Sequence, residues 1–471
     1  MKAIIIARQE LRSIFRERRF QAAAAILSIL FALSVFGAWD YYASNEKQHA
    51  EAARTARAHW DNQEDKNPHS AAHYGTFVFK PVYPLSFFDR GIDAFTGNTL
   101  FLEGHVMHEA KHRAVADRSE LSRLGALTPA FVLGILFPLF IIVLGFGSIA
   151  SERESGNLRI LLAQGLRPAD LFFGKTLGLG VVVLSLALPF LLLGGLGLAA
   201  PGAGAEDWQR YGLMSAGYLI YLGCFIHLTL IVSAFAQRAN VALVALLGIW
   251  IAMCLISPKA VADFAAWSHP TPSWQAYQEA LQYDLKNGVD GHDPSAEYSK
   301  KLEEETLKKH GVSTVDSLPF NWDGFIMQKG EEHETYVFQK HKDALLAIYQ
   351  QQQNLLEASA LLSPYLLVNL SSQRLAGTDV HTFHNFLAAA EKYRVALVGE
   401  LNNDLMLNFK YGDWDGKRDK AFFASNKKFE YRGPAFREVW QISRPAMALL
   451  FGWYLLSGLL GLFVFQRIKP I

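Results

Sequence analysis

The segment Ser151–Gly178, SERESGNLRILLAQGLRPADLFFGKTLG, decides the fold of this chain, because it is a charged stretch between two long apolar runs. No Asp, Glu, Lys or Arg occurs from Leu124 to Ser151 or from Thr176 to Ala205. Each run exceeds the roughly 20 residues that an α-helix needs to cross a hydrocarbon layer of about 30 Å. The segment is therefore predicted to be a short polar connection between two transmembrane helices.

The pattern inside this connection indicates its side of the membrane and its local structure. Basic side chains close to membrane ends hold a loop on the cytoplasmic side. Leucines at helical spacing predict a short helix with one apolar face, and Pro168 suits the first turn of a second helix. The basic residues are Arg153, Arg159, Arg167 and Lys175, and the leucines are Leu158, Leu161, Leu162 and Leu166.

Further apolar runs extend this topology to the whole chain of 471 residues, which is 51% hydrophobic with a formal net charge of +1. We predict an all-α polytopic membrane protein with about six transmembrane helices, both termini inside, and two mainly helical extracytoplasmic insertions. The expected parts are residues 1–19 as an amphipathic interfacial helix, 20–39 as the first transmembrane helix, 40–123 as the first extracytoplasmic domain, 124–257 as transmembrane helices two to five with the connection at 152–175, 258–444 as the second extracytoplasmic domain, 445–466 as the sixth transmembrane helix, and 467–471 as a cytoplasmic tail.

The N-terminus carries a basic stripe beside an apolar stripe, as in helices that lie on the inner leaflet. A secretory signal is the alternative, but the basic region is too long and the apolar run has the length of a membrane span. A secretory signal has small residues at the cleavage site that follows its apolar run, whereas aromatic residues occupy that position here. The stripe consists of Arg8, Arg12, Arg16 and Arg19, and the aromatic residues are Trp39, Tyr41 and Tyr42.

The order of residues in the connection resembles the ABC-2-type permease family. Glu152-Arg153-Glu154-x-Gly156 is followed by a leucine-rich turn, then Arg167-Pro168, then Gly174-Lys175 at the next membrane helix. In the second insertion, Leu370–Leu405 is similar to a segment from a subfamily of such permeases that is known only as a domain of unknown function.

This resemblance implies a membrane subunit of an ATP-binding cassette transporter, located in a bacterial inner membrane, that takes part in export or envelope transport of an unidentified substrate. The connection would be the coupling helix that docks on a separate ATPase subunit, and that ATPase would bind ATP and Mg²⁺. No cofactor is expected in this chain. The implied partners are the ATPase, a second or related permease copy and membrane lipid. The two large outer domains depart from the compact pattern of many such permeases and suggest a periplasmic partner as well. The residues expected at the ATPase contact are Glu152, Arg153, Glu154, Gly156, Leu158, Leu161, Leu162 and Arg167.

Histidines outside the apolar runs raise the hypothesis of a metal site. His105, His108 and His112 have the spacing i, i+3, i+7, His69 and His73 have the spacing i, i+4, and such spacings place imidazoles on one face of a helix. Neutral imidazole is a good ligand for zinc, copper or nickel. The alternative is that they are ordinary solvated surface histidines.

Several other functions are disfavoured. Gly174-Lys175-Thr176 resembles the end of a phosphate-binding loop, but Ala169 occupies the position of its first glycine. The near-zero net charge argues against nucleic-acid binding. The lack of carboxylates within the spans argues against ion-coupled transport. A membrane-anchored sensor or assembly scaffold with ligand-binding outer domains remains the competing hypothesis.

Overall fold

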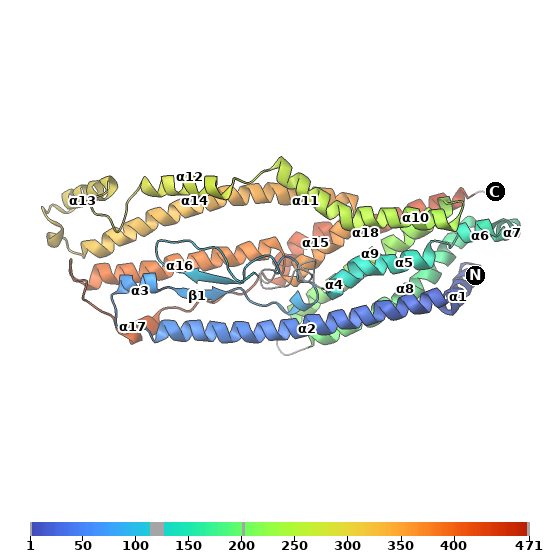
Figure 1. Ribbon diagram of the computed structural model, residues 1–471, viewed down its shortest axis with the longest axis horizontal. Helices are drawn as coiled ribbons and strands as arrows, with labels where there is room; N and C mark the ends of the chain where they lie inside the picture. Colours follow the sequence, from blue (N-terminus) through green and yellow to red (C-terminus); the bar gives the residue numbers. More distant parts are fainter. Residues whose placement is uncertain (1, 114–126, 200–202, 469–471) are drawn as a thin grey trace.

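The computed structural model describes residues 2–113, 127–199 and 203–468. The molecule is elongated, with apolar helices bundled at one end and polar helices and a small sheet at the other (Figure 1). Both ends of the described chain lie at the apolar end, beside α1 (Lys2–Arg16), α6 (Ala150–Glu154) and α7 (Asn157–Ala163).

Six helices in the described part of the chain are long and apolar enough to cross a membrane. This agrees with the predicted fold class, an all-α polytopic membrane protein. They are α2 (Arg18–Asp61), the stretch of α4 (Pro129–Phe131), η3 (Val132–Leu136), α5 (Phe137–Gly145) and α6, then α8 (Pro168–Leu198), α9 (Ala205–Phe235), the stretch of α10 (Ala239–Trp250), η4 (Ile251–Ile256) and α11 (Ser257–Ser268), and α18 (Phe436–Gln466).

Several of these helices extend beyond the hydrocarbon-length runs in the sequence. Helix α2 has 44 residues, or about 66 Å at 1.5 Å per residue, so about half of it extends beyond a membrane. The expected boundaries at residues 39, 257 and 445 all fall inside helices. Hydropathy locates the residues at which an apolar run gives way to charged side chains. A helix can continue through charged residues, and it ends only where residues that favour a helix are replaced by helix-breaking residues.

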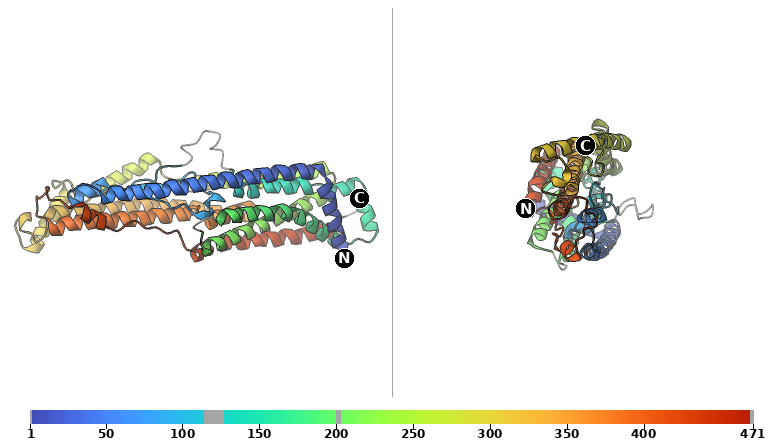
Figure 2. Two further views of the ribbon diagram at one scale, coloured as in Figure 1. Left: turned by 90° about the horizontal axis from the view of Figure 1, so that it is seen from below. Right: turned by 90° about the vertical axis from the view of Figure 1, so that its left-hand side faces the viewer.

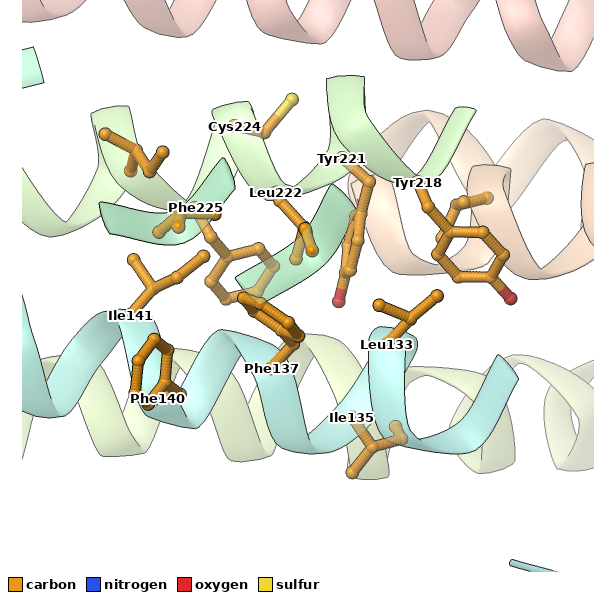
Figure 3. Close-up of a cluster of buried hydrophobic side chains, with 14 of the residues drawn as sticks. Leu133, Ile135, Phe137, Phe140, Ile141, Tyr218, Tyr221, Leu222, Cys224 and Phe225 are labelled. Atoms are coloured by element: carbon orange, nitrogen blue, oxygen red, sulfur yellow. The ribbon is translucent and has the colours of Figure 1, made fainter. Parts of the chain in front are cut away.

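The bundle is built around α9, whose aromatic face packs on η3 and α5. Figure 3 shows Phe137, Phe140 and Ile141 facing Leu222 and Phe225 of α9. In the same interface the Tyr221 hydroxyl donates to the backbone oxygen of Gly134 at 2.7 Å. Buried aromatic rings and a satisfied hydroxyl group stabilise this contact without leaving a polar atom unpaired in the apolar interior.

The polar end contains both insertions, and its helices run roughly parallel to the bundle (Figure 1). Strands β1 and β2 pair antiparallel, with Thr76 opposite Leu102. The expected end of the first insertion at residue 123 lies outside the described residues. The remaining elements are α3 (Pro68–Tyr74), β1 (Thr76–Phe79), η1 (Pro84–Phe87), β2 (Thr99–Leu102), α12 (Trp274–Lys286), α13 (Glu297–His310), η5 (Val315–Ser317), α14 (Trp322–Ser359), η6 (Ala360–Leu362), α15 (Pro364–Ala376), α16 (Val380–Asn408) and α17 (Lys420–Ser425).

The two insertions pack against each other and form one polar region. Trp60, near the end of α2, is 2% exposed, and its indole nitrogen donates to the backbone oxygen of Phe423 in α17 at 3.0 Å. Arg57 donates to the backbone oxygen of Asn426, also at 3.0 Å. These contacts hold α2 against the second insertion far from the apolar bundle.

Candidate functional site

The connection between α5 and α8 forms two short helices at the extreme end of the bundle (Figure 1). Gly156 separates α6 from α7 with a φ of 77°, and Gly165 follows α7 with a φ of 75°. Both angles lie in the left-handed region, which side chains disfavour, so these turns need glycine. A side chain at Gly156 would meet no atom within 4 Å, so here its role is to make the turn possible.

Glu152 contributes to an internal ion network, although the sequence suggested an outward contact. The Lys175 ammonium group, in the first turns of α8, lies 2.6 Å from Glu152 Oε1 and 2.6 Å from Glu10 Oε2 of α1. The Lys175 side chain is 5% exposed. One buried cation thus joins α1, α6 and α8, and charge-assisted hydrogen bonds of this length are strong. We call these three residues the Lys175 triad.

Arg153 also turns inward. Its guanidinium group donates to the backbone oxygen of Ala234 at 2.8 Å and to that of Ala236. These carbonyl groups lie at the C-terminal end of α9, where the last turn of a helix has no intrahelical donors. Arg153 therefore caps α9 and fixes the start of the connection on the bundle.

The leucines of the connection attach α7 to the bundle. Leu158 is 1% exposed, and Leu162 and Leu166 are half-buried against the same apolar core. Leu161 is half-buried as well. The apolar face predicted from the spacing thus points towards the membrane helices.

The opposite face of the connection is open to solvent. Ile160 is the exposed apolar residue at its centre, with 56% of its surface accessible. Of the residues predicted to make the ATPase contact, Glu154 and Arg167 lie on this face and Gly156 lies at its turn. Sequence analysis did not assign Ile160, because its exposure depends on which side of α7 packs on the bundle. The outer face consists of Glu154, Arg159, Ile160, Gln164 and Arg167.

Helix α1 lies across the end of the bundle, roughly perpendicular to the long helices (Figure 2). It packs closely on α8 at two glycines. A side-chain carbon at Gly174 would lie 2.6 Å from Cβ of Ile6, and one at Gly178 would lie 2.8 Å from Cβ of Glu10. On the other side of α1, Ile4 and Ile5 are exposed, as expected for a helix that inserts an apolar face into a membrane surface.

Family models match two adjacent parts of the chain. Residues 119–275 match a model described as an ABC-2 family transporter protein, and this range contains the whole connection with its outer face, together with Glu152 and Lys175 of the Lys175 triad. This match places the membrane part of the chain that it covers in the ABC-2 transporter permease family. The chain is therefore a transmembrane component of an ABC transporter, a class that implies an ATPase partner. The resemblance found in the sequence is confirmed.

The outer region of this permease carries a second match. Residues 273–432 match a domain of unknown function (DUF3526), which begins just before α12 and ends shortly before α18. None of the curated proteins matches the chain.

Within the permease, two polar residues of the membrane helices, Lys175 and His227, have structural roles. Lys175 belongs to the Lys175 triad inside α8, so it has no resemblance in structure to the lysine of a phosphate-binding loop. His227 of α9 hydrogen-bonds Ser457 of α18 through Nδ1 at 3.0 Å. A polar contact between two membrane helices stabilises their association.

His69 and His73 share helix α3, as their spacing predicted, but His105, His108 and His112 do not share a helix. Residues 105–112 form turns and extended backbone. His105 (φ 63°) and His112 (φ 60°) both have a backbone conformation in the left-handed region. His108 hydrogen-bonds Glu103 at 2.5 Å, and His112 is exposed. Antiparallel bridges between Thr99 and Lys111 and between Glu103 and Val106 hold this segment beside the sheet, which excludes a helix. His105 alone joins other histidines, those of α3 and a distant loop.

Proposed function

We propose that this permease is driven by a separate ATP-binding cassette ATPase, which docks on the outer face of the connection. The observation that supports this proposal is the two-sided construction of α6 and α7. Leu158 and Arg153 hold one side on the bundle, while the opposite side exposes Ile160 between charged residues. An apolar anchor surrounded by charges is typical of the centre of a protein interface.

The Lys175 triad provides a route for force. A push on α7 acts on α6 through the turn at Gly156 and on α8 through the turn at Gly165. Because Lys175 binds Glu152 and Glu10 at once, α1, α6 and α8 move together as one unit. Such rigid-body motion is how small shifts at an interface become large ones elsewhere.

The proposal includes a topology. The end of the molecule with the connection and both chain ends faces the cytoplasm, where the ATPase and ATP are, and the polar end is extracytoplasmic. Positively charged residues at the connection and in α1 support this orientation. A second permease copy or a related chain completes the pathway, and the substrate is exported or handed to an envelope partner.

The docking test uses the full-length permease co-expressed with its genomic neighbours. Ile160→Asp places a charge at the centre of the outer face. The matched control is Leu407→Asp, which changes an exposed residue, 69% accessible, at the polar end. We expect Ile160→Asp to lose co-purification of an ATPase and permease-stimulated ATP hydrolysis, while the control retains both. Equal ATPase recovery with the two variants, at equal membrane insertion, contradicts the docking proposal.

A labelling experiment tests the topology independently. Cys224 and Cys254 are buried, so single cysteines introduced at Gln164 and Tyr298 provide the accessible thiols. A membrane-impermeant maleimide added to intact spheroplasts is expected to label Tyr298→Cys and to leave Gln164→Cys unlabelled until the membrane is opened. Labelling of Gln164→Cys from outside reverses the topology and, with it, the site of ATPase docking.

A further inference from the structure

Four histidines from three separate segments converge in the polar end. His69 and His73 lie on α3, His105 lies in the turn after β2, and His292 lies in the loop between α12 and α13. Their six ring-to-ring distances are all between 4.6 and 5.4 Å. Nearly equal distances among four rings mean that the rings sit at the corners of a tetrahedron. We call these four residues the histidine cluster.

These distances fit a metal site. An imidazole nitrogen about 2.0–2.1 Å from zinc puts its ring centre about 3.2 Å from the ion, so four tetrahedral rings have centres about 5.2 Å apart. The ligand atoms themselves all lie within 4.8 Å of one another. The Nε2 atoms of His69 and His73 are 3.1 Å apart, close to the edge of about 3.3 Å expected for a zinc tetrahedron.

Two of the rings are oriented by hydrogen bonds on the side away from the cluster. The Nδ1 atom of His69 lies 2.8 Å from Asn402 Oδ1, and Nδ1 of His105 lies 2.6 Å from Glu334 Oε2. Each bond leaves Nε2 of its ring free to face the other histidines. Ligand histidines in metalloproteins are held in this way by a carbonyl or carboxylate oxygen on the second ring nitrogen.

The Nε2 atom of His105 is a second, independent observation. It is buried and has no hydrogen-bond partner within the described part of the chain. A buried polar atom without a partner is costly, and it points to a ligand. The cluster is accessible for that ligand, because His73 and His292 are exposed while His69 and His105 form its inner wall.

The surroundings also favour a cation. Glu331 is 1% exposed and accepts a hydrogen bond from the backbone nitrogen of His105 at 2.9 Å. Arg394 pairs with Glu331 on the far side and is itself 1% exposed, which fixes that carboxylate in place. Carboxylates close behind imidazole ligands increase their basicity and partly balance the charge of a bound ion.

The protonation of the rings is compatible with ligation. Burial lowers the pKa of His69 to about 3, and burial together with the neighbouring histidines lowers the pKa of His73 and of His292. For His105, burial acts in the same direction, but the hydrogen bond and charge of Glu334 outweigh it and raise the pKa.

We propose that the histidine cluster binds one late first-row transition-metal ion, and that this ion is Zn²⁺. Four imidazole nitrogens in a tetrahedron suit zinc, whereas Cu²⁺ and Ni²⁺ favour tetragonal arrangements. Four protein ligands complete the shell and leave no position for a reactive water, so the ion is structural. It joins α3 and the turn after β2, in the first insertion, to the loop before α13 in the second.

The experiment uses the full-length permease in detergent, purified through a tag without histidine and stripped of metal with a chelator. Zn²⁺ is titrated against a chromophoric chelator, and Co²⁺ is added separately because its visible absorption is intense in a four-coordinate site. We expect saturable binding of one Zn²⁺ per chain and a four-coordinate Co²⁺ spectrum. The expected result for His292→Gln and His73→Gln is affinity lower by at least about tenfold to a hundredfold.

The variants are chosen so that misfolding cannot imitate the result. His292 and His73 are exposed, so their replacement leaves the buried packing in place, as size-exclusion profiles can verify. His59→Gln changes an exposed histidine of α2 outside the cluster and is expected to bind like the wild type. Absence of saturable Zn²⁺ binding, or equal affinity in His59→Gln and His292→Gln, overturns the proposal, as does a six-coordinate Co²⁺ spectrum.

Discussion

Replacing Lys175 by methionine tests the ion network that joins the connection to the bundle. Methionine replaces the apolar stem of lysine atom for atom but lacks the terminal ammonium group, so Glu10 and Glu152 stay close together without their shared partner. Removing one partner of a buried ion pair costs about 3–5 kcal/mol. The two carboxylates are 14% and 24% exposed, so water offsets part of the cost and we expect about 3 kcal/mol.

The assay is unfolding of the purified permease in mixed micelles, followed by tryptophan fluorescence and by loss of the monodisperse size-exclusion peak on heating. Lys259→Met is the control, because Lys259 forms an exposed pair with Asp263, with side chains 78% and 65% accessible. An exposed pair contributes about 0–1 kcal/mol, so this variant should unfold like the wild type.

A third variant separates charge from packing. If the cost of Lys175→Met arises from two unpaired carboxylates, adding Glu10→Gln and Glu152→Gln should recover most of the lost stability, since neutral amides need no cation. The reasoning is refuted if Lys175→Met is as stable as Lys259→Met, or if the neutralised triple variant is no more stable than Lys175→Met alone.

Three further predictions concern other parts of the molecule. Gly178→Leu should lower stability by about 1–3 kcal/mol by pushing α1 off α8, whereas Gly180→Leu, with open space around it, should not; equal melting temperatures would show that α1 is not packed there. Glu334→Gln should weaken Zn²⁺ binding about 10- to 100-fold in the chelator competition, while the exposed Glu332→Gln leaves it unchanged. Trp60→Ala should cost about 3–5 kcal/mol and make the polar end sensitive to limited proteolysis, and unchanged protease resistance would contradict its role in joining α2 to α17.

The Lys175 triad and the histidine cluster have a common design. In both, side chains from segments distant in the sequence meet at one positive centre: the ammonium group in the triad and, by our proposal, Zn²⁺ in the cluster. The first joins helices at the bundle end, and the second joins the insertions at the polar end. If the permease transmits force along its length, the segments at each end must be held together by such contacts so that they move as a unit.

The sequence was sufficient for the membrane architecture and for the family. Uncharged runs of hydrocarbon length can be read locally, because a bilayer tolerates few charges within a span. The leucine spacing from Leu158 to Leu166 likewise predicted which side of α7 is apolar. Helix ends were not predictable from hydropathy, since α2 continues past Trp39 through residues that favour a helix in water as well.

Only the tertiary structure decided which charged side chains point into the bundle, which face solvent, and which residues make up each site. Glu152 and Glu154 are two residues apart, yet one meets Lys175 and the other faces solvent, because Glu10 of α1 and Lys175 of α8 arrive on one side only. Likewise, His105 joins His292 rather than His108, since the sheet prevents a helix at residues 105–112. Local patterns report local backbone and burial, whereas a contact between segments far apart in the chain depends on how all the helices pack.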